Sequence, residues 1–163
     1  MADTTGIFDV LKDDHDKHRK ILEQLADTSG ESEERRNLFE RFTIDVKSHA
    51  AAEEQALYST MLRKPETTDE TRHSVAEHHE IDEMLNDLAA TDMSSSAWMS
   101  KFKDLRHRYE HHIEEEEDDH FPDFEKHLTD ADLAHMRSVF RRRKEAECAE
   151  QEVTPEKMEE AKE

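Results

Sequence analysis

An internal repeat of 63 positions restricts the fold of this chain more than any other feature of its sequence. Shifting the first half by 63 positions superposes residues of the same kind: His15 on His78, Phe39 on Phe102, His49 on His112 and Glu53-Glu54 on Glu116-Glu117. Each copy contains one histidine and, 34 residues later, the pattern His-x-x-x-Glu. The chain is therefore expected to fold as two similar halves that bring the same polar side chains to matching places.

Each half is predicted to be a hairpin of two helices. Apolar residues recur every three or four positions, as on one face of an α-helix, in four segments: residues 7–27, 33–62, 69–90 and 97–121. Gly30, Pro65 and Pro122 mark ends of these segments. With 2 glycines and 3 prolines in 163 residues, the loops must be short, so successive helices lie antiparallel. The expected fold is all-α, an up-down-up-down four-helix bundle formed by residues 1–127.

A short helix over residues 128–147 is expected to dock on the bundle. It begins with a capping pattern, Thr129-Asp130-Ala131-Asp132, and it carries one apolar stripe made of Leu133, Met136, Val139 and Phe140. From Arg141 onward the chain is charged and poor in apolar residues, which favours a frayed helix or disorder. Residues 148–163 are interpreted as a charged, flexible tail, in which Thr154-Pro155-Glu156 is compatible with one further weak helix.

The charge of the chain excludes several kinds of partner. A formal net charge of −20 repels nucleic acid and anionic membranes and attracts cations. The single cysteine, Cys148, permits neither an intramolecular disulfide nor a thiolate cluster. The first residues show no signal peptide, and no stretch is long enough to span a membrane. The expectation is a cytoplasmic protein that is a monomer or a weak homodimer.

Several histidines and glutamates fall on the apolar faces of the expected helices. His78 shares its face with Leu85, and His112 continues the stripe of Leu105 and Tyr109. A glutamate four residues after a histidine lies on the same helical face. The buried stripes are therefore expected to include six polar side chains: His15, His49, Glu53, His78, His112 and Glu116.

The loop positions put the four histidines at one level of the bundle. His15 lies 15 residues before Gly30, and His49 lies 19 residues after it. His78 and His112 have the same offsets from Met93, which occupies the corresponding turn. At a rise of about 1.5 Å per residue, a mismatch of about four residues is roughly one helical turn. All four helices are therefore expected to deliver an imidazole to one interior cavity.

A core that holds four imidazoles and two carboxylates requires a compensating charge. A buried unpaired charge costs on the order of several kcal/mol, against a total stability of roughly 5–15 kcal/mol. Bound cations remove this cost. The absence of thiolates excludes zinc sites of the cysteine type, and a mixed imidazole and carboxylate set fits iron, manganese or zinc. Six such ligands are too many for one tetrahedral ion, and they suit two ions bridged by Glu53 and Glu116.

The pattern resembles the hemerythrin-like family, also named the HHE cation-binding family. The matching motifs cover most of residues 8–125: Asp14-His15, His49-Ala-Ala-Ala-Glu53-Glu54, Glu77-His78-His79-Glu80 and His112-Ile-Glu-Glu-Glu116-Glu117. The resemblance implies a non-haem site of two iron ions with terminal histidines and two bridging carboxylates. It also implies reversible binding of dioxygen or nitric oxide, or use of the domain as an iron or oxygen sensor.

The resemblance adds one candidate ligand and one alternative. Oxygen carriers of the family have a second histidine four residues after the third-helix histidine, where this chain has Asp82. A carboxylate at that position would change the charge and the redox preference of the iron. The carriers also use a carboxylate five residues after the last histidine, which corresponds to Glu117, whereas the internal repeat favours Glu116. The predicted metal ligands are therefore His15, His49, Glu53, His78, Asp82, His112 and Glu116.

Two other functions remain open. Di-iron oxidases and peroxide-decomposing enzymes of the ferritin type use Glu-x-x-His motifs, a spacing that Glu70/His73 and Glu117/His120 match. These pairs lie near one end of the expected bundle, which ranks an enzyme below a ligand-binding protein. The third hypothesis is a regulatory or scaffold module, in which the metal stabilises the fold and the acidic tail contacts a partner.

The other histidines and the two tyrosines receive simpler interpretations. His18, one turn after His15, is expected to pack beside the site rather than to bind metal. Tyr58 and Tyr109 are expected to be core aromatics whose hydroxyls find a partner. The remaining histidines are expected to be solvated: His73, His79, His107, His111, His120, His127 and His135.

Overall fold

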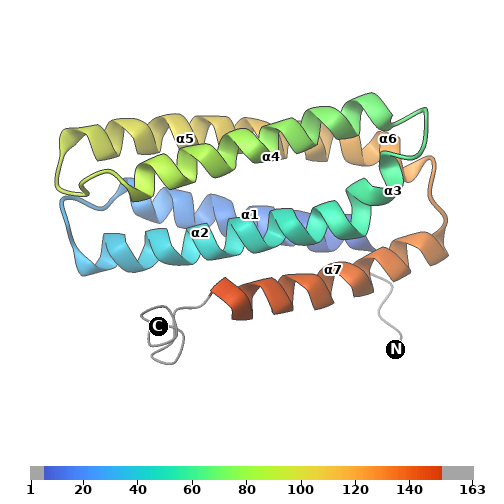
Figure 1. The fold of residues 1–163 in the computed structure, drawn as a ribbon, viewed down its shortest axis with the longest axis horizontal. Helices are drawn as coiled ribbons and strands as arrows, with labels where there is room; N and C mark the ends of the chain where they lie inside the picture. Colours follow the sequence, from blue (N-terminus) through green and yellow to red (C-terminus); the bar gives the residue numbers. More distant parts are fainter. Residues whose placement is uncertain (1–5, 152–163) are drawn as a thin grey trace, which may run out of the picture.

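The computed structural model describes residues 6–151, which form five continuous helices and no strand (Figure 1). The helices and their π-helical turns, written η, have these bounds: α1 Ile7–Ala26; α2 Glu33–Glu53, η1 Glu54–Tyr58 and α3 Ser59–Met61, which run on as one helix; α4 Thr68–Ala89; α5 Ser96–Glu115, η2 Glu116–His120 and α6 Phe121–Glu125, which also run on as one; and α7 Asp130–Gln151. The predicted all-α bundle with an added C-terminal helix is confirmed.

The bundle closes because each long helix packs on two neighbours. Helix α1 lies against α2 and α5, and α4 lies against α5 and α2. The loops that follow α1 and α4 lie at one end of the bundle, and the loop between α3 and α4 lies at the other (Figure 1). Helix α7 runs along α1 and α2 on the outside of this ring. Within the described part of the chain, the first hairpin therefore has a covering helix that the second hairpin lacks.

The end of the bundle with two loops is fastened by one buried arginine. Arg35 donates from Nε and Nη2 to the hydroxyl and carbonyl oxygens of Thr28, and from Nη1 to the carbonyl of Met93. Its guanidinium also lies 4.4 Å from the ring centroid of Trp98. Gly30 adopts φ 64°, a backbone conformation that favours glycine. These contacts join the turn of the first hairpin to the turn of the second.

The apolar core is divided into two clusters with polar residues between them. One cluster includes Leu22, Phe42, Leu85 and Phe102 and occupies the end with the two hairpin turns. The other includes residues from α1, α2, η1, α3 and α6 together with Phe140 of α7. The buried histidines and glutamates predicted from the repeat lie along the helices between these clusters. Packing on both sides therefore keeps the polar level away from bulk water.

Two sequence expectations about helix ends are wrong. Pro122 does not end the fourth helix, which continues to Glu125. The π-helical turn η2 ends at His120, two residues before Pro122. Such a turn displaces the backbone carbonyls of the preceding turn, with which the proline ring would otherwise clash. The helix expected over 128–147 runs to Gln151, so the segment from Arg141 is not frayed there. The weak helix proposed at Thr154-Pro155-Glu156 and most of the expected tail lie outside the described residues.

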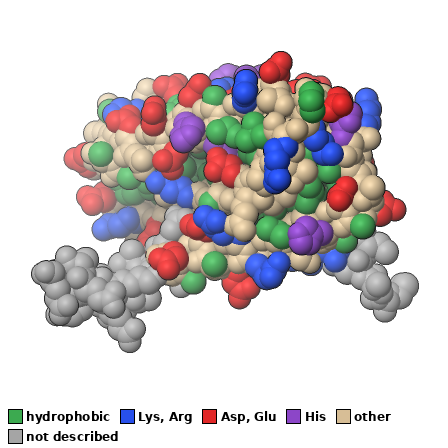
Figure 2. Space-filling model, turned by 45° about the vertical axis from the view of Figure 1, so that its right-hand side comes forward, with side chains coloured by type: hydrophobic (Ala, Val, Ile, Leu, Met, Phe, Trp, Pro, Cys, Tyr) green, Lys and Arg blue, Asp and Glu red, His purple; other side chains and the backbone are tan. Residues whose placement is uncertain are grey.

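The surface carries the charge that the composition requires. Figure 2 shows acidic side chains over the whole of the face drawn, interspersed with lysines, arginines and several histidines. None of the helices in the described part of the chain combines the length and the apolar character that a membrane span requires.

Candidate metal centre

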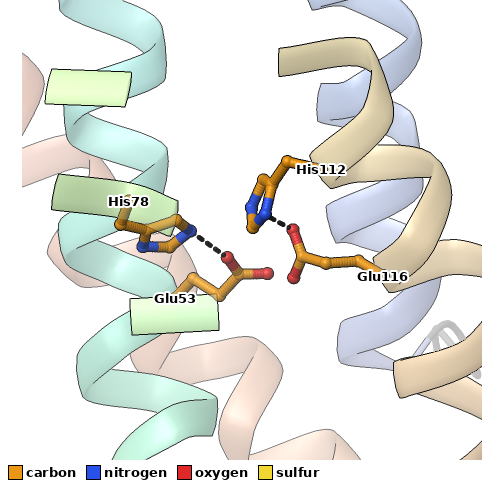
Figure 3. A group of neighbouring side chains, drawn as sticks. All are labelled: Glu53, His78, His112 and Glu116. Atoms are coloured by element: carbon orange, nitrogen blue, oxygen red, sulfur yellow. Dashed lines mark ion pairs between the residues drawn. The ribbon is translucent and has the colours of Figure 1, made fainter. Parts of the chain in front are cut away.

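The structure brings six of the seven predicted ligands together inside the bundle. They come from α1, α2, α4, α5 and the start of η2, and every one is buried: His15, His49, Glu53, His78, His112 and Glu116. Figure 3 shows Glu53 and Glu116 facing each other, with His78 beside the first and His112 beside the second. The internal repeat therefore predicted a real cluster of side chains.

The six residues form two groups that share one carboxylate. The first group is His15, His49 and Glu53, whose potential ligand atoms lie within 4.8 Å of one another. The second group is Glu53, His78, His112 and Glu116, under the same distance limit. In this group His78 Nε2 lies 3.1 Å from Glu53 Oε1, and His112 Nε2 lies 2.8 Å from Glu116 Oε1 (Figure 3).

Glu116 also reaches toward the first group. Its Oε1 lies 3.8 Å from His15 Nε2, and its Oε2 accepts a hydrogen bond of 2.8 Å from the hydroxyl of Tyr58. Glu116 Oε1 is thus directed between His15 of the first group and His112 of the second, while Tyr58 holds Glu116 Oε2. Both Glu53 and Glu116 are placed to bridge two cations.

Buried polar atoms without regular hydrogen bonds make the cavity a candidate cation site. Five buried atoms of the cluster make no hydrogen bond of regular geometry: His15 Nε2, His49 Nε2, Glu53 Oε1, Glu53 Oε2 and Glu116 Oε1. Two of them, Glu53 Oε1 and Glu116 Oε1, lie at ion-pair distance from His78 and His112. A buried polar atom without a partner costs about 1–3 kcal/mol. Imidazole nitrogens and carboxylate oxygens are the ligands that iron, manganese and zinc accept. The residues present therefore fit a pair of such ions.

Each ligand histidine is oriented by a carboxylate on a neighbouring helix. The Nδ1 atom bonds to the carboxylate in every case: His49 to Asp14 (2.8 Å), His78 to Glu54 (3.3 Å), His112 to Glu77 (3.0 Å) and His15 to Glu117 (2.7 Å). Such a bond fixes the tautomer and leaves Nε2 free to bind metal. The four bonds form a closed ring around the bundle, which passes from α1 to α2, α4, α5 and back to α1.

The ring of carboxylates was not predicted, although its signal was present in the sequence. Asp14, Glu54, Glu77 and Glu117 each stand next to a candidate ligand in the residue pairs that the repeat superposes: Asp14-His15 on Glu77-His78, and Glu53-Glu54 on Glu116-Glu117. In each pair one residue faces the cavity, and the other reaches across to a histidine of the next helix. Glu117 is thus occupied by His15, which supports the choice of Glu116 as the inward-facing carboxylate.

Cations support three of these four carboxylates. Lys144 of α7 lies 2.7 Å from Asp14, Arg108 lies 2.9 Å from Glu77, and Arg19 lies 3.0 Å from Glu117. Among the described residues no lysine or arginine pairs with Glu54, whose side chain is 43% exposed. Glu54 also makes the longest of the four bonds to a ligand histidine. His78 is therefore the least firmly held of the four imidazoles.

The electrostatics of the two groups differ. Burial lowers the pKa of His49 to about 3. Burial also lowers the pKa of His112, but the charge of Glu116 and hydrogen bonds to Glu116 and Glu77 outweigh it and raise that pKa to about 9. Burial and the charge of Glu116 raise the pKa of Glu53 well above its usual range. Without a cation, the second group therefore holds protons at neutral pH that metal would have to replace.

A π-helical turn begins at or directly after each of the two inward-facing glutamates, Glu53 and Glu116. Turn η1 begins at Glu54, directly after Glu53, and turn η2 begins at Glu116 itself. Such turns are rare and are frequently found at functional sites. Both halves of the repeat contain one at the corresponding place, so the distortion belongs to the repeated unit and to its site.

The structure does not bring Asp82 to the cluster, which corrects the seventh predicted ligand. Its side chain is 51% exposed and lies 3.3 Å from Lys47. A step of four residues turns a helix about 40° beyond a full turn, and His78 already lies at the edge of the buried stripe. The same step carries Asp82 out to the surface. His18 is buried beside the site and, as expected, is not a ligand, because its nitrogens bond to Tyr109 and Asp45.

One of the two Glu-x-x-His pairs of the ferritin-type alternative, Glu117/His120, is divided between different contacts in the structure. Glu117 is bonded to His15 of the cluster rather than grouped with His120. His120 was expected to be solvated, but it is buried, with 6% of its surface exposed. It lies on η2, where the widened turn changes which side chains face inward.

A groove reaches the second group from the surface. It lies between α2 and α4, has a volume of about 210 Å³, and is lined in part by Ala50, Ala51, Glu54, His78 and Asp82. The two alanines leave space beside His78 that larger side chains would fill. In the described part of the chain this groove leads to His78 of the second group.

Comparison with known proteins gives a consistent result. The sequence profile of the Hemerythrin HHE cation binding domain matches residues 6–124. A hemerythrin-like protein of Schizosaccharomyces pombe is 26% identical over 145 residues, which cover 86% of this chain and 70% of that protein. The crystal structure of a hemerythrin HHE cation binding domain-containing protein from Mycobacterium kansasii superposes with a TM-score of 0.79 at 23% identity, over 90% of this chain and 89% of that one. The last comparison supports the fold.

Proposed function

The chain belongs to the hemerythrin HHE cation-binding domain family, and we propose that it holds two iron ions and binds dioxygen or nitric oxide at them. The observation that supports this most strongly is the sharing of Glu53 between two groups of buried ligand atoms. One carboxylate that serves two groups is the arrangement expected of a bridged pair of ions. The buried atoms around it that make no regular hydrogen bond supply the remaining ligands.

The six buried side chains would be divided between the two ions. His15 and His49 would hold one ion, His78 and His112 the other, and Glu53 and Glu116 would bridge them. Each ion would then have four protein ligands, fewer than the six positions of an octahedral iron. Bound iron would supply the redox chemistry and the open coordination position for a diatomic ligand.

The protein contributes orientation, exclusion of water and access. The carboxylate ring directs each Nε2 into the cavity. Apolar residues of both core clusters surround the polar level and keep water out. The groove beside Ala50 and Ala51 offers a small molecule a path to His78. A diatomic ligand is therefore expected to approach the second group first.

Anaerobic iron loading followed by exposure to air tests the proposal. We expect about two irons per chain by elemental analysis and, on addition of dioxygen or nitric oxide, a new charge-transfer absorption of a ferric or nitrosyl iron pair. The Glu53→Ala variant should lose both signals, whereas His79→Ala, which removes an exposed histidine of α4, should keep them. One tightly held zinc and no spectral response to either gas would overturn the proposal.

A further inference from the structure

A second cluster of imidazoles and carboxylates lies on the outer side of α4 and α5. The potential ligand atoms of His73, Glu77 and Glu115 lie within 4.8 Å of one another. His73 Nε2 lies 3.2 Å from Glu115 Oε1 and 3.5 Å from Glu77 Oε1. The Nε2 atom of His120 lies 3.3 Å from the same oxygen of Glu115. Two imidazoles from different helices thus converge on one carboxylate oxygen.

A buried histidine, His120, is oriented toward this cluster by a hydrogen bond. His120 is 6% exposed, and its Nδ1 lies 3.0 Å from the hydroxyl of Ser74. With Nδ1 engaged there, Nε2 is the atom presented to Glu115. The ring of His120 lies 6.1 Å from that of His73. A half-exposed histidine on α4 and a buried one on η2 therefore form the two sides of a site that solvent can reach.

The donor set indicates the class of ligand. Calcium and magnesium prefer oxygen ligands alone, so two imidazoles disfavour both. The cluster contains no thiolate, and two nitrogens with one or two carboxylate oxygens suit zinc and neighbouring divalent transition metals. We propose that His73, Glu115 and His120, with Glu77 as a fourth ligand, form a surface site for a divalent transition metal such as zinc. This site lies outside the buried cluster, touches it only through Glu77, and does not depend on the buried metal being iron.

Glu77 connects the outer site to the buried centre. Its Oε1 accepts the hydrogen bond from His112 Nδ1 at 3.0 Å and also faces His73, while its Oε2 is held by Arg108 at 2.9 Å. A cation at the outer site would compete with His112 for this oxygen. Glu77 is therefore the weakest candidate of the four outer ligands, and Glu115 is the strongest because both imidazoles face it.

Zinc binding to the full chain, already loaded with metal at the buried centre, tests the site. Equilibrium dialysis against zinc with elemental analysis should show one additional zinc per chain, which a mild chelator removes while the buried metal stays. His73→Ala should abolish the additional zinc and leave the buried metal content unchanged. Because His73 is half exposed, this variant should fold normally. His107→Ala, which removes an exposed histidine two turns before Glu115 on α5, is the matched control.

The possible results separate the outer site from the buried one. Loss of the additional zinc in both His73→Ala and Glu115→Ala, with retention in His107→Ala, supports the proposal. Retention of the additional zinc in His73→Ala and Glu115→Ala, or its loss in His107→Ala as well, overturns it, since either result means dispersed binding to surface histidines. Failure of the wild-type chain to bind additional zinc at millimolar concentration also overturns it. A chain that binds the outer zinc but no iron would refute the proposed function alone.

Discussion

The two ends of the buried cavity have equivalent ligands but different surroundings. The first group lies beneath α7: the ring of Phe140 lies 5.4 Å from that of His49, and Lys144 supports Asp14. No helix within residues 6–151 covers the second group in this way, and the groove between α2 and α4 leads to His78. Duplication therefore explains which side chains face the cavity, but not how each end is sealed.

The repeat also shows how the two ends came to differ. Arg19, which supports Glu117, corresponds under the shift of 63 positions to Asp82, and no lysine or arginine of residues 6–151 pairs with the equivalent carboxylate Glu54. Asp45, which bonds Lys144 of α7, corresponds to Arg108. The differences lie one layer outside the ligands. We infer that this outer layer, rather than the ligands, determines which ion is exposed to incoming molecules.

Removal of Glu53, the carboxylate shared by the two groups, should abolish metal binding at both ends of the cavity and so remove the difference between them. Glu53→Ala takes a ligand from both groups, so we expect both metals to be lost, with affinity falling by more than the roughly 100-fold that follows loss of an outer carboxylate. Glu116→Ala should weaken the second group more than the first. Elemental analysis after dialysis measures this. Retention of one full equivalent of metal by Glu53→Ala would contradict the shared role.

Changes of pH should separate the two ends. The pKa of His49 is about 3, so this imidazole is neutral near pH 7, whereas the pKa of His112 is about 9, so it must lose a proton to bind metal. Between about pH 6.5 and 9 we expect affinity at the second group to rise by about tenfold per pH unit. Metal affinity at the first group should change less with pH, because His49 is already neutral in this interval and any proton on Glu53 affects both groups alike. Calorimetry in buffers of different ionisation enthalpy counts the protons released.

The raised pKa of His112 affects the stability of the metal-free protein in the opposite direction from its effect on metal affinity. A histidine whose pKa is higher in the folded chain stabilises it fully below the unfolded value of 6.5, and this contribution disappears as the pH rises through about 9. The metal-free protein should therefore become less stable toward alkaline pH while metal binding improves. A pH-independent unfolding midpoint over that interval, or equal proton release at both groups, would refute the assignment.

Removal of α7's lysine should affect the first group selectively. Lys144→Met leaves Asp14 and Asp45 without their shared cation, and we expect a loss of about 2 kcal/mol in the free energy of unfolding, typical of a hydrogen bond to a charged group. Arg108→Met removes the matching support of Glu77 from a more exposed position and should cost about half as much. Urea unfolding of both metal-free variants makes the comparison. An equal or larger loss in Arg108→Met would show that α7 does not distinguish the ends.

Restoring the missing cation should make the ends more alike. Asp82→Arg places an arginine where the repeat has Arg19, so that Glu54 gains a partner and the groove beside His78 narrows. We expect a chelator to remove the second metal about threefold more slowly, below the roughly tenfold to hundredfold effects of deleting an outer carboxylate. Asp87→Arg is the control, because it makes the same charge change on α4. Identical rates in both variants would mean that Glu54 needs no cation.

The sequence predicted the helices and the inward-facing ligands because both depend on local periodicity. His15, His49, His78 and His112 could be placed from their spacing to the turns alone. Asp82 was misplaced because a family correspondence outweighed the direction of its own helical face. His120 was misjudged since a π-helical turn changes the register by one residue, and no local pattern announced that turn. Lys144 could not be foreseen because it reaches the site from a helix that has no counterpart in the repeat.

The closed ring of carboxylate–histidine bonds has a consequence for how such a chain could arise. The bond between Asp14 and His49 lies within the first hairpin, and the bond between Glu77 and His112 lies within the second. The other two bonds join the hairpins. Under the shift of 63 positions each bond maps onto another of the same kind. A single hairpin would therefore leave His15 without an orienting carboxylate, and a second identical copy would supply it. The bundle therefore has the bonding pattern that two identical hairpins would form across a twofold axis.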